Sequence, residues 1–483
     1  MADAAAVAEA VARARRAAPE WSPLPVRRRV EALAELARVF ERRADDLAAS
    51  IVEETGKPQA EALAEVVVSV ELIRYYRAHA PRHLRPRRVS SGWMMWKKAW
   101  VEREPLGVVG AITPWNYPLI LAMDAVTTAL VAGNAVVVKP SELTPLATTM
   151  IPELCREAGL PEGVVQVVTG DGRTGEALVR SGVDKIFFTG STAVGRKVMA
   201  AAAETLTPVT LELGGKDPAI VLDDADLERA ARGIAFGGFF NAGQTCISIE
   251  RIYVLEPVAD AFIEALVREA RALRWDGAGA RDLGPMITAA QHRKVSEHIE
   301  DAVAKGARIL TGGVPEAGEG AIAPTVLADI DATMKVYAEE TFGPVLPVIP
   351  VPSEEEAVRR ANDTAYGLFA SVWTGNRKRG LRLARQIRSG GVSINDSLSH
   401  YGVGGLPMGG VADSGFGSRR GLEGLDEMTR VRTYFADRGG LTREPWWFPY
   451  DDRGERLTRA VLALRARGGV SGLIAAAKRM LER

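Results

Sequence analysis

The chain has no surplus of either charge, few cysteines and no long apolar run. Its 483 residues contain 61 lysines and arginines and 61 aspartates and glutamates, so the formal net charge is zero, whereas nucleic-acid-binding chains are usually basic. Its two cysteines, Cys155 and Cys246, are too few for a disulfide framework or a structural zinc site. We find neither a signal peptide nor a stretch of about 18 uninterrupted apolar residues. These absences predict a cytoplasmic protein without a metal site and without a nucleic-acid partner.

The composition is that of a globular protein. Hydrophobic residues make up 47% of the chain and charged residues 25%, which excludes a disordered chain. A chain of this length is expected to form two or three domains. In residues 1–80 apolar side chains recur every three or four positions, for example from Val30 to Phe40. This spacing predicts amphipathic helices.

Beyond Val101, short β-branched segments alternate with helical segments, which predicts βαβ units and parallel sheets. The first group of predicted strands comprises Val108–Ile112, Ala135–Val138, Val164–Val168 and Lys185–Phe188. The second group comprises Ala219–Leu222, Ile252–Leu255, Ala307–Leu310, Val345–Val348 and Val392–Ile394. Two groups predict two α/β domains in tandem, with a boundary near residue 213. The tryptophan-rich segment Val89–Arg103 fits neither a helix nor a core strand.

Cys246 is the better of the two cysteine candidates for a nucleophile. It follows a glycine-rich helical segment and ends the polar turn that begins at Asn241, where water and substrate could reach a thiolate. A buried, inert cysteine is the alternative. We expect that alternative for Cys155, because it lies within the amphipathic segment Ile151–Leu160.

Glu212 is a candidate general base. It lies between two leucines at a predicted strand end and is followed by Gly214 and Gly215. Partial desolvation would raise the pKa of this carboxyl and make it a usable base near neutral pH. A surface glutamate beside a turn is the alternative.

Three turns that follow predicted strands carry groups suited to a cofactor or an oxyanion. The segment Phe188–Gly195 runs from a strand through a glycine turn into a helix, the geometry that presents backbone N–H groups to phosphate. Lys139 and Glu142 follow another strand and can bond to ribose or phosphate oxygens. Both segments are also compatible with ordinary loops. Asn116 lies between two prolines that fix the backbone, as a preorganised oxyanion donor requires.

Taken together, six motifs resemble those of the aldehyde dehydrogenase superfamily, specifically its hydrolytic NAD(P)-dependent branch. They occur in the family's order and spacing: Pro114–Asn116, Lys139–Glu142, Phe188–Thr192, Leu211–Lys216, Gly243–Cys246 and Glu339–Pro344. The resemblance covers the chain from about residue 5 to about residue 437. Two further segments, Cys246–Arg251 and Ala361–Thr364, look like those of actinobacterial proteins called succinate-semialdehyde dehydrogenases.

The resemblance implies a role for each motif residue. Cys246 would attack an aldehyde as thiolate, and the Asn116 amide with the Cys246 backbone N–H would hold the oxyanion. The resulting thiohemiacetal would pass a hydride to NAD(P) and become a thioester, which Glu212 would hydrolyse by activating water. The residues expected to bind the cofactor are Lys139 and Glu142 at the adenine ribose, Gly190, Ser191 and Gly195 at the pyrophosphate, Glu340 and Phe342 at the nicotinamide ribose, and also Thr113, Trp115, Ser141, Gly172 and Leu213.

The resemblance also implies a division of the chain. A Rossmann-type cofactor domain would comprise residues 1–88 and 105–212, and a second α/β catalytic domain residues 213–415. Residues 89–104 and 425–437 would form a small β oligomerisation arm in a homodimer or homotetramer. The remaining residues, 438–483, would be a tail that the family does not explain.

The substrate is less constrained than the reaction. Relatives that oxidise succinate semialdehyde commonly carry an arginine eight residues after the motif asparagine, but here that position is Asp124. We expected Asp124 to repel a substrate carboxylate, which favours uncharged, hydrophobic aldehydes. The candidate pocket residues are also mostly apolar, namely Leu119, Ile120, Met123, Phe239 and Phe240.

Four function classes remain open at this point. The first is an aldehyde-to-acid dehydrogenase, of which succinate-semialdehyde dehydrogenase is one form. A CoA-acylating semialdehyde dehydrogenase and an acyl-phosphate reductase would share the cysteine, but neither would require Glu212. A non-enzymatic relative would be expected to lack Cys246 or Glu212.

For the cofactor, Glu142 would repel the 2′-phosphate of NADP and so favours NAD, whereas Lys139 would tolerate NADP as a second cofactor.

The tail has the pattern of two basic amphipathic helices separated by Gly468 and Gly469. Apolar residues share one face in each segment, namely Leu457, Ala460, Val461 and Leu464 in the first and Leu473, Ile474, Ala477 and Leu481 in the second. From residue 456 to 483 there are seven basic residues and one acidic residue, Glu482. Such helices can lie on an anionic membrane surface or pack across a neighbouring subunit. Both alternatives predict a helical tail that docks.

Overall fold

The computed structural model describes residues 1–94, 96–275, 281–314, 320–439, 442–444 and 446–481. These residues form two compact units, the first comprising Met1–Leu84 and Glu104–Arg430, the second Arg85–Arg103 and the described part of Val431–Arg483. None of the described helices is both long and apolar enough to cross a membrane.

The first unit contains two sheets, as the two groups of predicted strands required. The six strands of the first sheet lie in the order β15 (Gly415–Phe416), β7 (Val209–Glu212), β6 (Lys185–Thr189), β3 (Val108–Ile112), β4 (Ala135–Lys139) and β5 (Val165–Val167). All neighbouring pairs are parallel except β15 with β7. The α/β fold class is therefore confirmed for this half of the unit.

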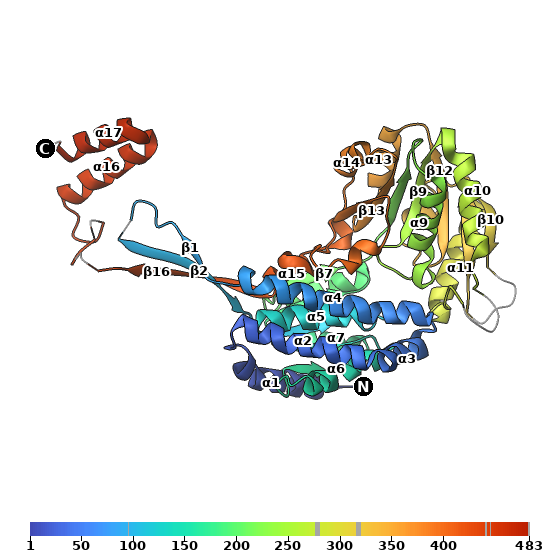
Figure 1. Cartoon of the computed structure of the whole chain (residues 1–483), viewed down its shortest axis with the longest axis horizontal. Helices are drawn as coiled ribbons and strands as arrows, with labels where there is room; N and C mark the ends of the chain where they lie inside the picture. The colour runs from blue at the N-terminus through green and yellow to red at the C-terminus, as the bar shows by residue number, and fades with distance from the viewer. Residues whose placement is uncertain (95, 276–280, 315–319, 440–441, 445, 482–483) are drawn as a thin grey trace. The chain divides into compact units, whose positions relative to one another are not determined.

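Helices cover both faces of the first sheet (Figure 1). On one side α1 (Ala4–Trp21), α7 (Gly172–Arg180) and α8 (Thr192–Ala203) contact the strands, and on the other side α5 (Ile120–Ala132) and α6 (Leu146–Glu157) do so. Behind α5 and α6 lie α2 (Val26–Arg42), α3 (Ala44–Thr55) and α4 (Gln59–His83). The helices predicted in residues 1–80 are thus confirmed, and α2, α3 and α4 form an outer layer over the first sheet.

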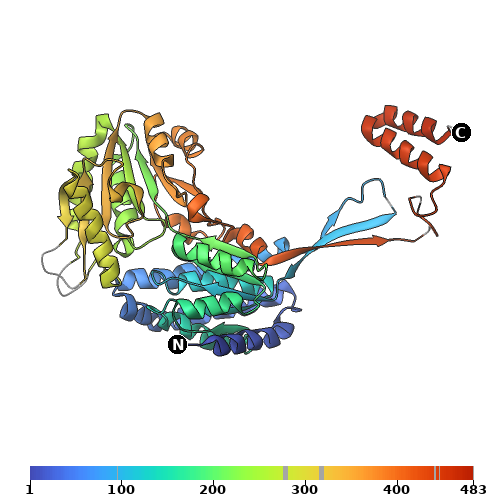
Figure 2. The same ribbon diagram turned by 180° about the vertical axis from the view of Figure 1, so that it is seen from behind.

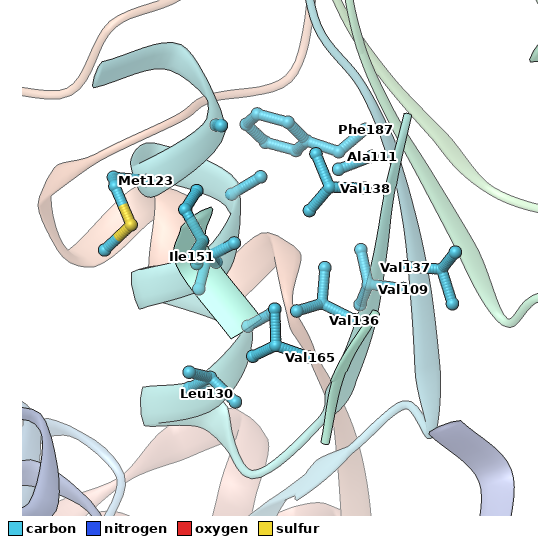
Figure 3. Close-up of a cluster of buried hydrophobic side chains, with 14 of the residues drawn as sticks. Val109, Ala111, Met123, Leu130, Val136, Val137, Val138, Ile151, Val165 and Phe187 are labelled. Carbon is cyan, nitrogen blue, oxygen red and sulfur yellow. The ribbon is translucent and has the colours of Figure 1, made fainter. Parts of the chain in front are cut away.

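The core of this half forms because successive strand side chains point to opposite faces. Figure 3 shows Val136 and Val138 of β4 pointing toward α5 and α6, while Val137 points to the other face. Opposite them lie Met123 and Leu130 of α5 and Ile151 of α6. Both faces of the sheet are buried, which explains why its strands are continuously apolar rather than alternating.

The second sheet has seven strands. Their order is β10 (Arg308–Gly313), β11 (Ala323–Ala328), β12 (Val345–Val351), β9 (Ile249–Leu255), β8 (Asp217–Val221), β13 (Phe369–Trp373) and β14 (Gly391–Ile394). Only β10 is antiparallel to its neighbour. The helices of this half are α9 (Leu227–Phe239), α10 (Glu256–Ala272), α11 (Ala289–Ala304), α12 (Lys335–Ala338), α13 (Glu354–Asn362) and α14 (Arg377–Ala384). It has its own buried cluster, separate from that of the first sheet.

The second unit is a three-stranded sheet followed by two helices. The strand order is β1 (Arg87–Val89), β2 (Lys97–Pro105) and β16 (Thr429–Asp437). Residues 425–427, which we expected in the arm, belong instead to α15 (Gly421–Glu427), because Leu425 is buried in the first core. The helices α16 (Asp452–Arg467) and α17 (Gly469–Leu481) lie side by side (Figure 2), so the predicted helical tail is confirmed as far as residue 481. Glu482 and Arg483, which entered the charge count, lie outside the described residues.

We predict that Ile151→Ala, in the core shown in Figure 3, lowers the free energy of unfolding by about 2–5 kcal/mol, since a fully buried side chain leaves a cavity. As a control, Val67→Ala removes an exposed apolar side chain from α4 and should change it by less than about 0.5 kcal/mol. Urea unfolding measures both. Equal effects of the two substitutions would contradict this assignment of the core.

Candidate active site

The motif residues of the first sheet gather at one edge. In the parallel ladder, Ile112 at the end of β3 lies opposite Phe188 of β6, and Thr189 lies opposite Glu212 at the end of β7. The turns that follow these strands therefore open at the same carboxyl edge, where open α/β sheets bind their ligands. From Glu212 the chain crosses directly to β8 of the second sheet, which brings the two halves together here.

Cys246 reaches this edge from the second half through a tight turn. The helix α9 ends at Phe239, and Asn241, Ala242 and Gly243 then all adopt positive φ angles of 55°, 53° and 69°. A Cβ at Gly243 would lie 2.2 Å from the carbonyl oxygen of Gly343, so the turn requires glycine there. As a result Cys246 is only partly buried, whereas Cys155 is fully enclosed in the first core, as predicted.

The Cys246 side chain lies between two cavities. One, of about 260 Å³, is lined mostly by apolar residues of α4, α5 and α9 and the segment 398–402. The other, of about 200 Å³, is lined by more polar groups that include Asn116, Lys294 and Glu340. A nucleophile in this position can face one molecule in each cavity.

The thiol of Cys246 is protonated at rest. Burial raises its pKa well above the ordinary value, the nearby Glu212 carboxylate raises it further, and Arg419 opposes both effects. Because the thiolate is the reactive form, the site must remove this proton, or bring in positive charge, before the cysteine can attack.

Asn116 is fixed beside Cys246 by three hydrogen bonds. Its amide Nδ2 donates to the Gln244 carbonyl at 2.9 Å, while its own backbone carbonyl accepts from Lys57 Nζ at 2.7 Å and from Asn241 Nδ2 at 3.0 Å. The amide nitrogen has a second N–H, and Asn116 and Cys246 line the same cavity. The arrangement is suited to binding a developing oxyanion next to the sulfur.

Lys57 and Glu65 form a buried support that the sequence analysis missed. Lys57 Nζ donates to Glu65 Oε1 at 2.9 Å, and Glu65 Oε2 accepts from the N–H groups of Leu119 and Ile120, where α5 begins. The pair thus connects α4 to the segment that carries Asn116. The sequence signal was only the turn Gly56-Lys57-Pro58, and nothing in it identifies a partner 59 residues away.

Glu212 is buried and bound to an arginine. One carboxylate oxygen accepts a short hydrogen bond from Arg419 Nη1, and Arg419 also donates to Thr189 Oγ1 at 2.7 Å. The other oxygen, Oε1, has no hydrogen-bond partner among the described residues. Burial raises the pKa of Glu212, although the Arg419 charge lowers it. Glu212 does not line either cavity beside Cys246, so in this conformation it is held back from the sulfur.

Asp124 does not face the substrate cavity, which corrects our expectation that it would repel a carboxylate there. It is buried, accepts a 2.6 Å hydrogen bond from Tyr401 Oη, and lies 3.5 Å from Arg420 and 3.9 Å from Arg419. Two arginines therefore neutralise it. Among the five apolar residues expected to line the pocket, Ile120 and Phe240 do so, whereas Leu119, Met123 and Phe239 are packed in the two cores.

A larger cavity of about 870 Å³ follows the carboxyl edge of the first sheet. Of the predicted cofactor residues, it is lined by Thr113, Trp115, Lys139, Ser141, Glu142, Gly172, Gly190 and Ser191. Glu340, Phe342 and Leu213 line the polar cavity next to Cys246. Gly195 lines neither cavity; it lies in α8, where a Cβ would be 2.5 Å from Leu213 Cδ2, so its small size permits close packing of that helix.

These residues fit a dinucleotide. The hydroxyl of Thr113 is buried, has no hydrogen-bond partner within the described part of the chain, and borders the large cavity, as expected of a group that bonds a ligand. The N-terminus of α8 opens on the cavity behind its N-cap Ser191, where backbone N–H groups favour phosphate. Lys139 Nζ lies 3.5 Å from Glu142 Oε2, which places an ammonium and a carboxylate together for ribose hydroxyls.

A second buried lysine–glutamate pair holds the loop that carries Glu340. Lys216 donates to Glu250 at 2.6 Å, and Glu250 accepts from the backbone N–H groups of Thr341 and Phe342 at 2.7 and 2.8 Å. Glu340 Oε1 accepts from the Gly215 N–H at 2.9 Å, and burial raises the pKa of Glu340 to about 7. Lys216 and Glu250 both belong to segments that the sequence analysis named, Leu211–Lys216 and Cys246–Arg251. Nothing in the sequence indicates that these two residues pair.

Comparisons with known proteins agree with this geometry. The sequence model of the aldehyde dehydrogenase family matches residues 1–434. A 4,4'-diapolycopene aldehyde oxidase of a Methylomonas species is 43% identical over 453 residues, which are 93% of this chain and 85% of that protein. A putative succinate-semialdehyde dehydrogenase [NADP(+)] of Mycolicibacterium smegmatis is 40% identical over 437 residues, 89% of this chain and 84% of that protein. The crystal structure of an NAD-dependent aldehyde dehydrogenase from Sinorhizobium meliloti superimposes with a TM-score of 0.88 at 39% identity, covering 92% of this chain and 89% of that one.

We predict that iodoacetamide alkylates only one of the two cysteines in the folded protein. Cys246 borders two cavities and should react, whereas Cys155 is buried and its pKa is raised to about 12. Because burial also raises the pKa of Cys246, the labelling rate should still be climbing at a pH above the ordinary thiol pKa of about 8.5. Mass spectrometry of labelled protein measures this. Cys246→Ala should abolish labelling and Cys155→Ser should leave it unchanged; the reverse pattern would remove Cys246 from the site.

Proposed function

Because the chain belongs to the aldehyde dehydrogenase family, and so oxidises aldehydes to carboxylic acids with NAD(P)+ through a cysteine thioester, we propose that its substrates are uncharged, apolar aldehydes. One observation carries this proposal: among the residues that the structure describes, no lysine or arginine lines the apolar cavity at Cys246. A substrate carboxylate would find no cation there.

The walls of that cavity support the same substrate class. They consist largely of Ala64, Val68, Tyr117, Ile120, Leu121, Phe236, Phe240, Ile247, Leu398 and Tyr401. The two charged residues that line it are acidic, Glu61 and Glu65, and burial raises the pKa of Glu61 to about 7. An anionic substrate would approach these carboxyls in an apolar setting, which is unfavourable. The preference for uncharged aldehydes therefore follows from these cavity residues and not from Asp124.

The names of the two relatives indicate two different classes of aldehyde substrate. The M. smegmatis relative is named for succinate semialdehyde, which carries a carboxylate, and the Methylomonas relative for 4,4'-diapolycopene aldehyde, which carries none. The cavity favours the second kind of substrate. At about 260 Å³ it accommodates the reacting end of an aldehyde, and a longer chain would extend outward.

For the chemical steps we assign roles from the geometry. The Cys246 thiol releases its proton to solvent, and the resulting thiolate adds to the aldehyde carbon. The free N–H of the Asn116 amide with the Cys246 backbone N–H stabilises the oxyanion. The cofactor, when bound, supplies the hydride acceptor in the adjacent polar cavity. Glu212 then takes a proton from the water that hydrolyses the thioester. To do so its carboxylate must rotate away from Arg419.

A buried carboxyl with a raised pKa favours hydrolysis over transfer to CoA or phosphate. Those alternatives do not need a base for water, whereas Glu212 is a buried carboxyl near Cys246 whose pKa is raised. For the cofactor we propose NAD as the preferred form, because Glu142 would repel a 2′-phosphate, with Lys139 beside it tolerating NADP.

We also propose a function for each part of the chain. Residues 1–88 and 105–212 bind the cofactor, and residues 213–415 supply the nucleophile. The strand β16 exposes Val431 and Phe435 on the arm. Apolar residues on an unpaired edge favour pairing with another chain, here a second copy in a homodimer or homotetramer. The two unpaired cysteines accord with a cytoplasmic location.

The proposed role of Glu212 predicts a specific kinetic defect. In Glu212→Gln the thioester should form but not hydrolyse, so the first-turnover burst of NADH remains while steady-state turnover falls by about 10²–10⁴-fold. In Cys246→Ala both should disappear, because no thioester can form. Stopped-flow absorbance of NADH measures the two phases. Loss of the burst in Glu212→Gln would mean that Glu212 acts before hydride transfer.

A substrate panel tests the proposed substrate class. We expect aromatic and long aliphatic aldehydes to have a higher kcat/KM than succinate semialdehyde, with no stimulation by CoA, because the cavity has apolar walls and no cation. Steady-state NADH formation measures each member of the panel. A clear preference for succinate semialdehyde would refute the proposal and would require a carboxylate-binding group elsewhere.

A further inference from the structure

The two C-terminal helices pack against each other through small residues. The only fully buried residues in α16 and α17 are Ala460 and Gly472. A Cβ at Gly472 would lie 2.7 Å from the carbonyl oxygen of Leu464, so α17 turns its glycine toward α16. Ala475 and Ala476, on the same side of α17 as Gly472, are half-buried. The most buried positions of the hairpin are therefore occupied by small residues, whereas Leu457, Val461 and Leu464 of α16 are only partly buried.

The large apolar residues of α17 face away from that seam. Val470, Leu473, Ile474, Ala477 and Leu481 are spaced at i, i+3, i+4, i+7 and i+11, so they form one continuous stripe. The exposed fractions of Val470, Leu473, Ile474 and Leu481 are 72%, 60%, 66% and 82%. On α16, Leu462 is also 67% exposed. A helical hairpin normally buries such a stripe between its helices, and its exposure indicates that something else covers it.

The helix α16 begins with two acidic residues, Asp452 and Glu455, but the rest of the hairpin is basic. From residue 456 to 481 the basic residues are Arg456, Arg459, Arg465, Arg467, Lys478 and Arg479, and there is no acidic residue. Arg459 pairs with Glu455 at the start of α16. The end of α16 and the last turn of α17 both carry basic residues. A basic, apolar helix surface is complementary to a layer that has an apolar interior and an anionic face.

Exposed aromatic residues precede the hairpin. Trp447, Phe448 and Tyr450 are 54%, 77% and 74% exposed, and aromatic side chains of this kind favour the membrane–water interface. Trp446, next to them, packs on Trp93 and Trp96 of the arm, with ring centroids 5.0 and 6.0 Å apart. Lys97 of the arm also forms a buried ion pair with Glu444. The segment that leads to the hairpin is thus attached to the arm within the second unit.

We infer that this hairpin docks the enzyme on the surface of an anionic lipid membrane. At about 1.5 Å per residue the 13 residues of α17 extend roughly 20 Å, less than the roughly 30 Å of a bilayer core, so the helix lies in the interface. A second copy of the hairpin is a less suitable cover, because a symmetric pair would bring its own arginines and lysines together. Docking itself does not depend on the substrate; that it delivers the enzyme to membrane-dissolved aldehydes rests on the proposed function.

Flotation of the full chain with vesicles tests the inference. Phosphatidylcholine vesicles that contain phosphatidylserine should carry the wild-type protein upward, and vesicles of phosphatidylcholine alone should carry much less. High salt should release the protein, because the attraction to anionic lipid is screened. Failure of the wild-type protein to float with anionic vesicles at low salt would overturn the inference.

Substitutions separate the two parts of the surface. Leu473→Glu with Ile474→Glu should reduce the floated fraction at least about 10-fold, since it places charge in the stripe. Arg465→Gln with Arg467→Gln should mainly remove the dependence on phosphatidylserine. As a matched control, Leu206→Glu changes a leucine that is 89% exposed in the first unit and should float like wild type. Equal flotation of the stripe variant and the wild type would refute the docking surface.

Two further measurements distinguish loss of lipid binding from misfolding and from loss of a subunit contact. All variants should oxidise a water-soluble aldehyde at the wild-type rate, which shows that they fold whatever the natural substrate is. A chain truncated after Tyr450 should lose flotation but keep its oligomer mass by light scattering. If truncation instead dissociates the oligomer, and the full chain does not float, a second copy covers the stripe and the lipid inference is wrong.

Discussion

Four buried charges hold the catalytic edge together. Asp124 on α5, Glu212 at the end of β7 and the consecutive Arg419 and Arg420 are all nearly inaccessible to solvent. Two negative and two positive groups balance one another, and removing any one would leave an uncompensated charge in the interior, which is strongly unfavourable. The segment before α15 is therefore attached to the first sheet, and Arg419 both positions the Glu212 carboxylate and stabilises its charge.

The site then follows from how two separately packed halves meet. The first sheet presents Asn116 and Glu212 at its carboxyl edge, and the second half supplies Cys246 through a turn of three positive φ angles. Buried lysine–glutamate pairs, Lys57 with Glu65 and Lys216 with Glu250, fix the backbone on either side. Their cost in desolvation is offset by the backbone hydrogen bonds that they complete. The polar groups around the sulfur are thereby preorganised, while the substrate side remains apolar.

The second unit differs from the first in which of its apolar side chains are buried. In the first unit large apolar side chains are buried and the exposed ones are scattered, which is normal for a folded domain. In the hairpin the fully buried residues are small, namely Ala460 and Gly472, and the large apolar residues of α17 are exposed. An exposed apolar stripe of this kind indicates a binding surface, and the basic residues of the hairpin restrict which partners are compatible. The catalytic chemistry and the docking surface can therefore be altered independently.

The sequence by itself determined the family, the fold class and most strands, because β-branched runs such as Val108–Ile112 and Ala135–Lys139 are buried on both faces and remain apolar throughout. It did not reveal β11 or β13, which mix polar and apolar residues and are specified by their neighbours in the sheet. By local chemistry it predicted Cys246 and Asn116 in turns and Glu212 at a strand end. Only the tertiary structure decided that Arg419 binds a glutamate 207 residues earlier, that Asp124 is bound by Tyr401 beside two arginines and that the leucines of α17 are exposed. These are long-range contacts, and a local pattern of residue types specifies which groups need a partner but not which partner the fold provides.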